Sequence, residues 1–83
     1  LGKPYPNPFN PVATIAYDVS FGCEIELSVY DLRGRLVEQL LSGYIEAGYY
    51  EIQWNAGTAA SGIYFLRLTA PEKAITQKMI LMK

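Results

Sequence analysis

Side chains that could take part in catalysis are few in this chain, and none has a suitable neighbour. Glu24 and Glu26 lie two residues apart, which places both carboxylates on one strand face, and paired carboxylates are the acid and base of many hydrolases. Ser61 could act as a nucleophile only beside a general base. The chain contains no histidine, and no G-x-S-x-G turn surrounds Ser61. We therefore expect the two glutamates to be solvated strand residues and the chain not to be an enzyme.

Metal and cofactor sites have equally little support. Asp18, Glu24, Glu26 and Asp31 are carboxylates in one half of the chain, but their spacing is not that of a calcium loop. Cys23 is the only cysteine, so neither an internal disulfide nor a cysteine cluster can form. We expect no catalytic residue, no metal and no cofactor.

The aromatic residues leave a sugar-binding platform open as an alternative. The chain has seven tyrosines and one tryptophan, and aromatic rings stack well on flat partners. Alternation places three aromatic residues on apolar strand faces, where core packing is the simpler explanation: Tyr17, Tyr50 and Trp54. Three tyrosines are expected to be exposed: Tyr30, Tyr44 and Tyr49. If these three rings lie coplanar on one face, a carbohydrate-binding role is supported; if they are buried, it fails.

Length and composition indicate one small domain. The chain has 83 residues, 51% of them hydrophobic, and seven basic and eight acidic residues are scattered along it. Without a basic stripe, nucleic-acid binding is not expected. No run approaches the roughly 18 to 20 apolar residues of a membrane span. The N-terminus has neither a signal-peptide pattern nor an initiator methionine, so we expect residues 1–83 to be one piece of a longer polypeptide, with Leu1–Pro4 the end of a linker.

The elements that must position these side chains are short strands. TIAYDV, EIELSVYD and YYEIQW alternate apolar and polar residues, which is typical of half-buried strands. RLVEQLL, IYFLRLTA and AITQKMILMK bring the count to six, separated by turns at FGC, DLRG, NAGTAASG and PEK and by a longer loop at SGYIEAG. Regular strands without a helix predict an all-β fold, an Ig-like antiparallel β-sandwich of six to seven strands. Tyr64, just after a turn, is placed where a tyrosine corner would fix the chain.

The C-terminal stretch KMILMK does not alternate. Met79–Met82 are apolar on both strand faces, between Lys78 and Lys83. One interpretation is a strand that is buried on both faces. The other is an exposed apolar terminal strand that is offered to a partner. The residues alone favour neither.

The lead-in YPNPFNP, residues 5–11, holds three prolines in seven positions. Each proline fixes φ and removes a backbone donor, and each restricts the residue before it to extended conformations. The segment therefore loses little conformational entropy on folding, and we expect Tyr5 or Phe9 to pack against an edge of the sandwich.

These stretches, in this order, resemble a known family. YPNPFNP, ATIAYDV, LSVYDLRGRLV, the pattern around GYYEIQW, SGIYFLRL and the lysine-bearing apolar end together resemble the C-terminal sorting domain of type IX secretion cargo, closest to type A. The likeness covers essentially the whole chain. The same signature is similar to the Ig-like domain of flagellar hook-capping proteins. The position of the apolar strand at the end of the sequence favours the sorting domain.

The resemblance implies a non-catalytic module that directs a folded cargo protein through the type IX outer-membrane translocon, with secretion or surface attachment as the destination. Its implied partners are the translocon, its processing machinery and an upstream cargo domain of the same chain. It assigns recognition to the proline motif, the G-x-Y strand and the terminal strand: Tyr5, Pro6, Asn7, Pro8, Phe9, Asn10, Pro11, Gly62, Tyr64, Lys78, Met79, Ile80, Leu81, Met82 and Lys83. The turn NAGTAASG is shorter and less acidic than in many relatives.

Two other functions remain alternatives at this point. The first is an accessory carbohydrate-binding module of an extracellular enzyme, for which the exposed tyrosines are the test. The second is a structural Ig-like spacer or assembly domain. An exposed last strand could also pair edge to edge, so we expect self-association to be possible at high concentration.

Overall fold

The computed structural model describes residues 1–82, and within them it contains six strands and no helix. The strands are β1 (Val12–Val19), β2 (Cys23–Asp31), β3 (Leu36–Ile45), β4 (Gly48–Asn55), β5 (Gly62–Ala70) and β6 (Lys73–Leu81). The expected all-β fold is confirmed. Accordingly, none of residues 1–82 lies in a helix that could cross a membrane.

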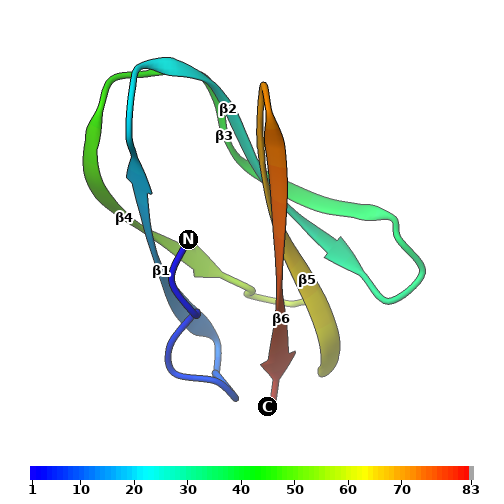
Figure 1. The fold of residues 1–83 in the computed structure, drawn as a ribbon. Coiled ribbons are helices and arrows are strands. Elements are labelled where there is room, and N and C mark those ends of the chain that lie inside the picture. Colours follow the sequence, from blue (N-terminus) through cyan, green and yellow to red (C-terminus); the bar gives the residue numbers. More distant parts are fainter. Residues whose placement is uncertain (83) are drawn as a thin grey trace.

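The strands form two antiparallel sheets that face each other (Figure 1). One sheet contains β1 and β4. The other contains β3, β2, β5 and β6 in that order, so β3 and β6 are its edges. Apolar residues alternate along the strands because only one face of each sheet is covered by the other sheet.

The lead-in connects the free edge of one sheet to the free edge of the other. Gly2 donates to the Ala16 carbonyl of β1, and Tyr5 exchanges two backbone hydrogen bonds with Thr14. Four residues later the chain reaches β6, where Phe9 forms a parallel bridge to Leu81. Figure 1 shows this blue segment running between the start of β1 and the end of β6. The expected seventh strand is thus reduced to two single bridges, since prolines remove the donors that a ladder requires.

The core is centred on Trp54, which is 1% exposed. The rings of Phe9 and Tyr64 lie on either side, each with its centroid 5.5 Å from that of Trp54. The Trp54 indole N–H donates to a Glu38 carboxylate oxygen at 3.1 Å, so its polar atom is satisfied. Since Phe9 is 2% exposed and belongs to the lead-in, the proline segment is part of the core. The expectation that Phe9 packs against the sandwich is confirmed.

The expectation of a longer loop at residues 42–48 was wrong. β3 continues to Ile45, and only Glu46 and Ala47 separate it from β4. Gly43 suggested a loop, but it lies opposite Ile25 within the β2–β3 ladder at φ 142°, a conformation that glycine adopts readily. The remaining turns are where the sequence predicts them.

The predicted tyrosine corner is confirmed. The Tyr64 hydroxyl donates to the Ala60 carbonyl four residues upstream at 2.6 Å, and the residue is 7% exposed. This bond ties the turn between β4 and β5 to the buried start of β5.

The substitution Tyr64→Phe should lower the free energy of unfolding by about 0.5 to 1.5 kcal/mol, because it removes the hydrogen bond to the Ala60 carbonyl. Urea denaturation measures the change. Tyr49→Phe is the matched control, since Tyr49 is 72% exposed. Equal stability of the two variants would contradict a role for the corner.

Candidate functional site

Three segments that are far apart in the sequence meet at one end of the four-stranded sheet. β5 and β6 pair with Gly62 opposite Leu81 and Tyr64 opposite Met79. Phe9 of the lead-in lies on the other side of β6, at Leu81. We call this group the terminal-strand site; it consists of Asn7, Phe9, Gly62, Tyr64 and Lys78–Met82.

The end of β6 has one buried and one outward face. Met79 and Leu81 are 0% and 1% exposed and belong to the core, whereas Ile80 is half-buried and Met82 is 58% exposed. Neither interpretation of KMILMK is therefore complete: the strand lies at the sheet edge, with half of its apolar residues inside. The absence of alternation in the sequence comes from Ile80 and Met82, which the other sheet does not cover.

The free edge of β6 is capped over its last residues by the lead-in. Phe9 donates its N–H to the Ile80 carbonyl at 2.9 Å and accepts from the Met82 N–H at 3.0 Å. The Asn7 side chain donates to the Lys78 carbonyl at 3.1 Å and accepts from the Ile80 N–H at 3.0 Å. The side-chain amide of Asn7 makes the hydrogen bonds that the backbone of a neighbouring strand would make, at a position where the flanking prolines have no N–H to donate. An open edge is a template for another chain, and this cap blocks it.

The first part of β6 has no such cap. N–H and C=O groups of alternate residues point to the same side of an antiparallel strand, so Ala74 and Thr76 face away from β5, as Ile80 does. No backbone partner within residues 1–82 covers that side of Ala74 or Thr76. The edge of β6 is thus open near its start and closed at its end.

Gly62 has a conformational requirement. Its φ is 152°, a value that side-chain-bearing residues rarely adopt, while a Cβ at this position would meet no heavy atom within 4 Å. The glycine of the G-x-Y pattern is therefore needed for the backbone direction that starts β5 against Leu81, and not for space.

The remaining predicted recognition residues lie elsewhere or carry no distinctive contact. Tyr5 lies on the β1–β4 side, where its hydroxyl donates to Glu51 at 3.2 Å; this hydrogen bond, followed by the negative charge of Glu51, raises the pKa of Tyr5. Asn10 is exposed. Within residues 1–82, Pro6 and Pro8 form no hydrogen bond, whereas the Pro11 carbonyl accepts from Ala56 N–H. Lys83 lies outside the described residues.

The exposed tyrosines do not form a sugar-binding platform. Tyr44 and Tyr49 are exposed, as expected, but they belong to different sheets, and Tyr30 is half-buried at the opposite end of β2 from the Tyr44 pairing position. Tyr17 and Trp54 are buried in the core, and Tyr50 packs against it with its ring centroid 5.3 Å from that of Tyr17. The carbohydrate-binding alternative loses the arrangement that would have supported it. Among residues 1–82 no three potential metal ligands cluster.

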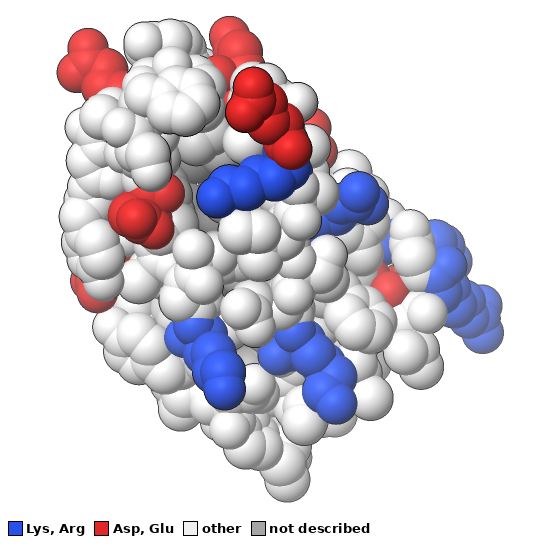
Figure 2. All heavy atoms as spheres, in the orientation of Figure 1, with Lys and Arg blue, Asp and Glu red and all other residues white. Residues whose placement is uncertain are grey.

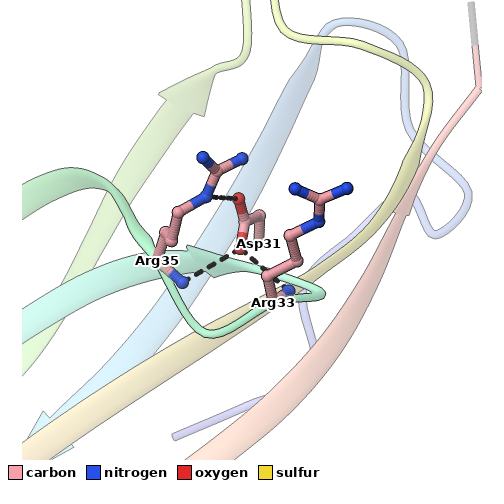
Figure 3. A network of polar contacts seen from close by, with 3 residues as sticks. All are labelled: Asp31, Arg33 and Arg35. Carbon is pink, nitrogen blue, oxygen red and sulfur yellow. Dashed lines mark hydrogen bonds and ion pairs between the residues drawn. The ribbon is translucent and has the colours of Figure 1, made fainter.

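The turn between β2 and β3 is organised by Asp31. One carboxylate oxygen accepts the backbone N–H groups of Arg33 and Arg35, each at 2.9 Å, and the other accepts from Arg35 Nε at 3.1 Å (Figure 3). The hydrogen bond from the Arg35 backbone, with the others, lowers the pKa of Asp31. Both arginine side chains extend to the same side of the hairpin, and Arg33 ends in an unpaired guanidinium within the described part of the chain (Figure 3).

Comparison with known proteins gives one match. The family model described as "Secretion system C-terminal sorting domain" matches residues 3–82. No curated protein matches, and no solved structure matches.

The substitution Asn7→Ala should lower the free energy of unfolding by about 1 kcal/mol, because it removes two partly solvated hydrogen bonds to β6. Asn7→Asp keeps the acceptor for Ile80 N–H but places a carboxylate oxygen against the Lys78 carbonyl, so it should not restore the lost stability. Urea denaturation ranks the two, with Asn10→Ala as the control. A loss in the control as large as in Asn7→Ala would contradict the cap.

The stabilisation from Asp31 should disappear in acid. Since the folded pKa is lowered, the contribution is complete above the ordinary value of 3.8 and is lost as the pH falls from there through the folded pKa. Thermal melting of the wild type and Asp31→Asn should differ at neutral pH, with the wild type more stable, and converge below that value. A difference that is independent of pH would show that the carboxylate charge is not responsible.

Proposed function

The chain belongs to the family of secretion system C-terminal sorting domains, and from this membership we propose that its terminal-strand site, in the folded state, is the surface that the secretion machinery recognises. Domains of this family direct cargo proteins into type IX secretion, and the cargo reaches the cell surface or the medium through the outer membrane. The family is not a catalytic one. It acts as part of a cargo chain and interacts with the type IX machinery.

The observation that carries the proposal is the cap on the end of β6. Asn7 and Phe9 hold the last residues of the strand by four hydrogen bonds, although those residues could have been left as a loose tail. The cap fixes the outward direction of Ile80 and Met82 on a rigid strand. A pre-ordered apolar surface loses less conformational entropy on binding than a flexible tail does, and this favours recognition of the folded end.

The same geometry supports a role for the lead-in in recognition. The proline motif and the terminal strand lie side by side at the end of the sheet, so one partner surface can contact both. We take the outer-membrane translocon and its processing machinery as that partner. We also hold that residues 1–83 are one sorting domain of a longer secreted protein. In the structure Leu1 already packs against the core, and the linker assigned to Leu1–Pro4 stays a prediction.

Removal of residues 79–83 is not a clean test of recognition. It deletes two core side chains, Met79 and Leu81, and each such loss costs about 2 to 5 kcal/mol against a typical total of about 5 to 15. The domain would unfold, and an export defect would not distinguish recognition from folding.

The outward-facing variant Ile80→Lys/Met82→Lys separates the two. A fluorescent protein with a periplasmic signal and residues 1–83 at its C-terminus is expressed in a host with a working type IX system. We expect the wild-type fusion to be exported and the variant to be exported at about a tenth of that level or less, which corresponds to about 1.4 kcal/mol of lost recognition. Fluorescence in the medium and in the periplasm measures the ratio.

The control variant is Phe21→Lys/Tyr49→Lys, which changes two exposed apolar residues outside the site. It should be exported like the wild type, and circular dichroism of all three domains should agree. Normal export of Ile80→Lys/Met82→Lys would refute the proposed surface, while failure of the wild-type fusion, with native cargo exported, would refute the sorting function of this chain in that host.

A further inference from the structure

A second surface, which extends from Lys78 and Ile80 of β6 across the outer face of the four-stranded sheet, has the composition of a binding site. The β-ladder registers place Tyr30 opposite Leu36 on β3 and opposite Phe65 on β5, and Phe65 opposite Lys78 on β6. These four residues therefore form one row across the whole four-stranded sheet. Their strand neighbours Val29, Leu66 and Met79 are buried in the core, so the row points to the outer face.

Three of the four residues in this outer row are aromatic or aliphatic, although no sheet covers it. Leu36 is 58% exposed, and Tyr30 and Phe65 are half-buried, with Ile63 and Ile80 forming the next cross-strand pair on the same face. An outward sheet face of a monomer is normally polar. Large exposed apolar patches on soluble proteins mark interaction sites.

The hairpin turn makes this surface concave. A hollow of about 290 Å³ lies between the turn and the sheet, lined by Tyr30, Asp31, Leu32, Gly34, Phe65, Arg67 and Thr76. Leu32 is 68% exposed at its rim. The turn is held in place by the three Asp31 hydrogen bonds, so the hollow is built into the fold.

The lining of the hollow contains one cation, Arg67, and one carboxylate, Asp31, which is paired with Arg35, and two further basic residues lie near it. Arg67 lies two residues along β5 from Phe65, Lys78 lies opposite Phe65, and Arg33 is at the turn. None of these three cations has a carboxylate within ion-pair distance among the described residues; of the described basic side chains, only Arg35 has one, in its pair with Asp31. Figure 2 shows basic side chains over the right and lower parts of this view, whereas the acidic ones lie mainly at the top and left.

We propose that this outer face of the four-stranded sheet docks an acidic protein segment that also carries apolar side chains. The tyrosine, phenylalanine and leucine supply the buried contact, and aromatic residues with arginine are the types enriched at the centres of protein interfaces. The unpaired cations around them attract carboxylates and reject basic partners. The surface shares Lys78 and Ile80 with the terminal-strand site, but the proposal does not depend on the sorting role, since it is tested by binding in solution.

The test uses the ¹⁵N-labelled 83-residue chain and two synthetic twelve-residue peptides. One alternates Glu with Leu and Tyr; the other has Lys in place of every Glu. We expect the acidic peptide to shift the amide signals of Tyr30, Phe65, Arg67 and Thr76, and the basic peptide to leave them unchanged. Raising the salt from about 0.05 M to about 0.5 M should weaken the binding, because these charges are exposed to solvent.

Charge reversal provides the matched comparison. Arg67→Glu/Lys78→Glu should raise the dissociation constant of the acidic peptide at least about tenfold. Lys3→Glu/Lys73→Glu changes the net charge by the same amount at exposed positions outside the row. This variant should leave the dissociation constant of the acidic peptide unchanged. Equal weakening in both variants would show a net-charge effect and overturn the proposal. The proposal would also be overturned if the acidic peptide did not bind, or if it shifted amide signals elsewhere on the domain. It would be overturned too if the amide signals of the row shifted only with an acidic polysaccharide or only at raised protein concentration.

Discussion

The hydrogen bonds between Phe9 and the end of β6, together with burial of the Phe9 ring against Trp54, join the lead-in to the four-stranded sheet. Earlier in the same segment, Gly2 and Tyr5 are bonded to β1. One stretch of about ten residues therefore connects the free edges of both sheets. A small domain has a free energy of unfolding of only about 5 to 15 kcal/mol. Since removal of a core aromatic side chain typically costs about 3 to 5 kcal/mol, Phe9 contributes a large share of that stability.

The prolines and asparagines of the lead-in have complementary roles in this arrangement. A proline-rich segment cannot form a ladder, which keeps it from becoming an ordinary strand that would extend the sheet. The Asn7 side chain supplies a donor and an acceptor to β6 between two prolines that have no backbone N–H. The result is an edge that is closed at the end of β6, while Ile80 and Met82 remain available on the outer side. Closure of this edge and the orientation of the proposed sorting surface thus depend on the same few contacts.

Much of the fold could be predicted from local patterns. Alternation placed Ile15, Leu27 and Trp54 in the core, and the position of Tyr64 after a turn indicated its corner. The prediction of a loop at residues 42–48 was wrong, because Gly43 indicates a turn only where no neighbouring strand pairs with it, and here Ile25 does. The cap could not be predicted, because it joins Asn7 to Ile80 across 73 residues and depends on which edge β6 occupies. The outer row was missed for a related reason: Leu36, Tyr30 and Phe65 become neighbours only through the ladder registers.

The central claim is that the lead-in closes the end of β6 and leaves its start open, and residue-resolved amide hydrogen exchange of the wild-type chain tests it most directly. Slow exchange is expected for the Ile80 and Met82 amides, which donate to Asn7 and Phe9, and fast exchange for Ala74 and Thr76, which have no such acceptor within residues 1–82. Uniform protection along β6, or fast exchange at Ile80 and Met82, would contradict the account.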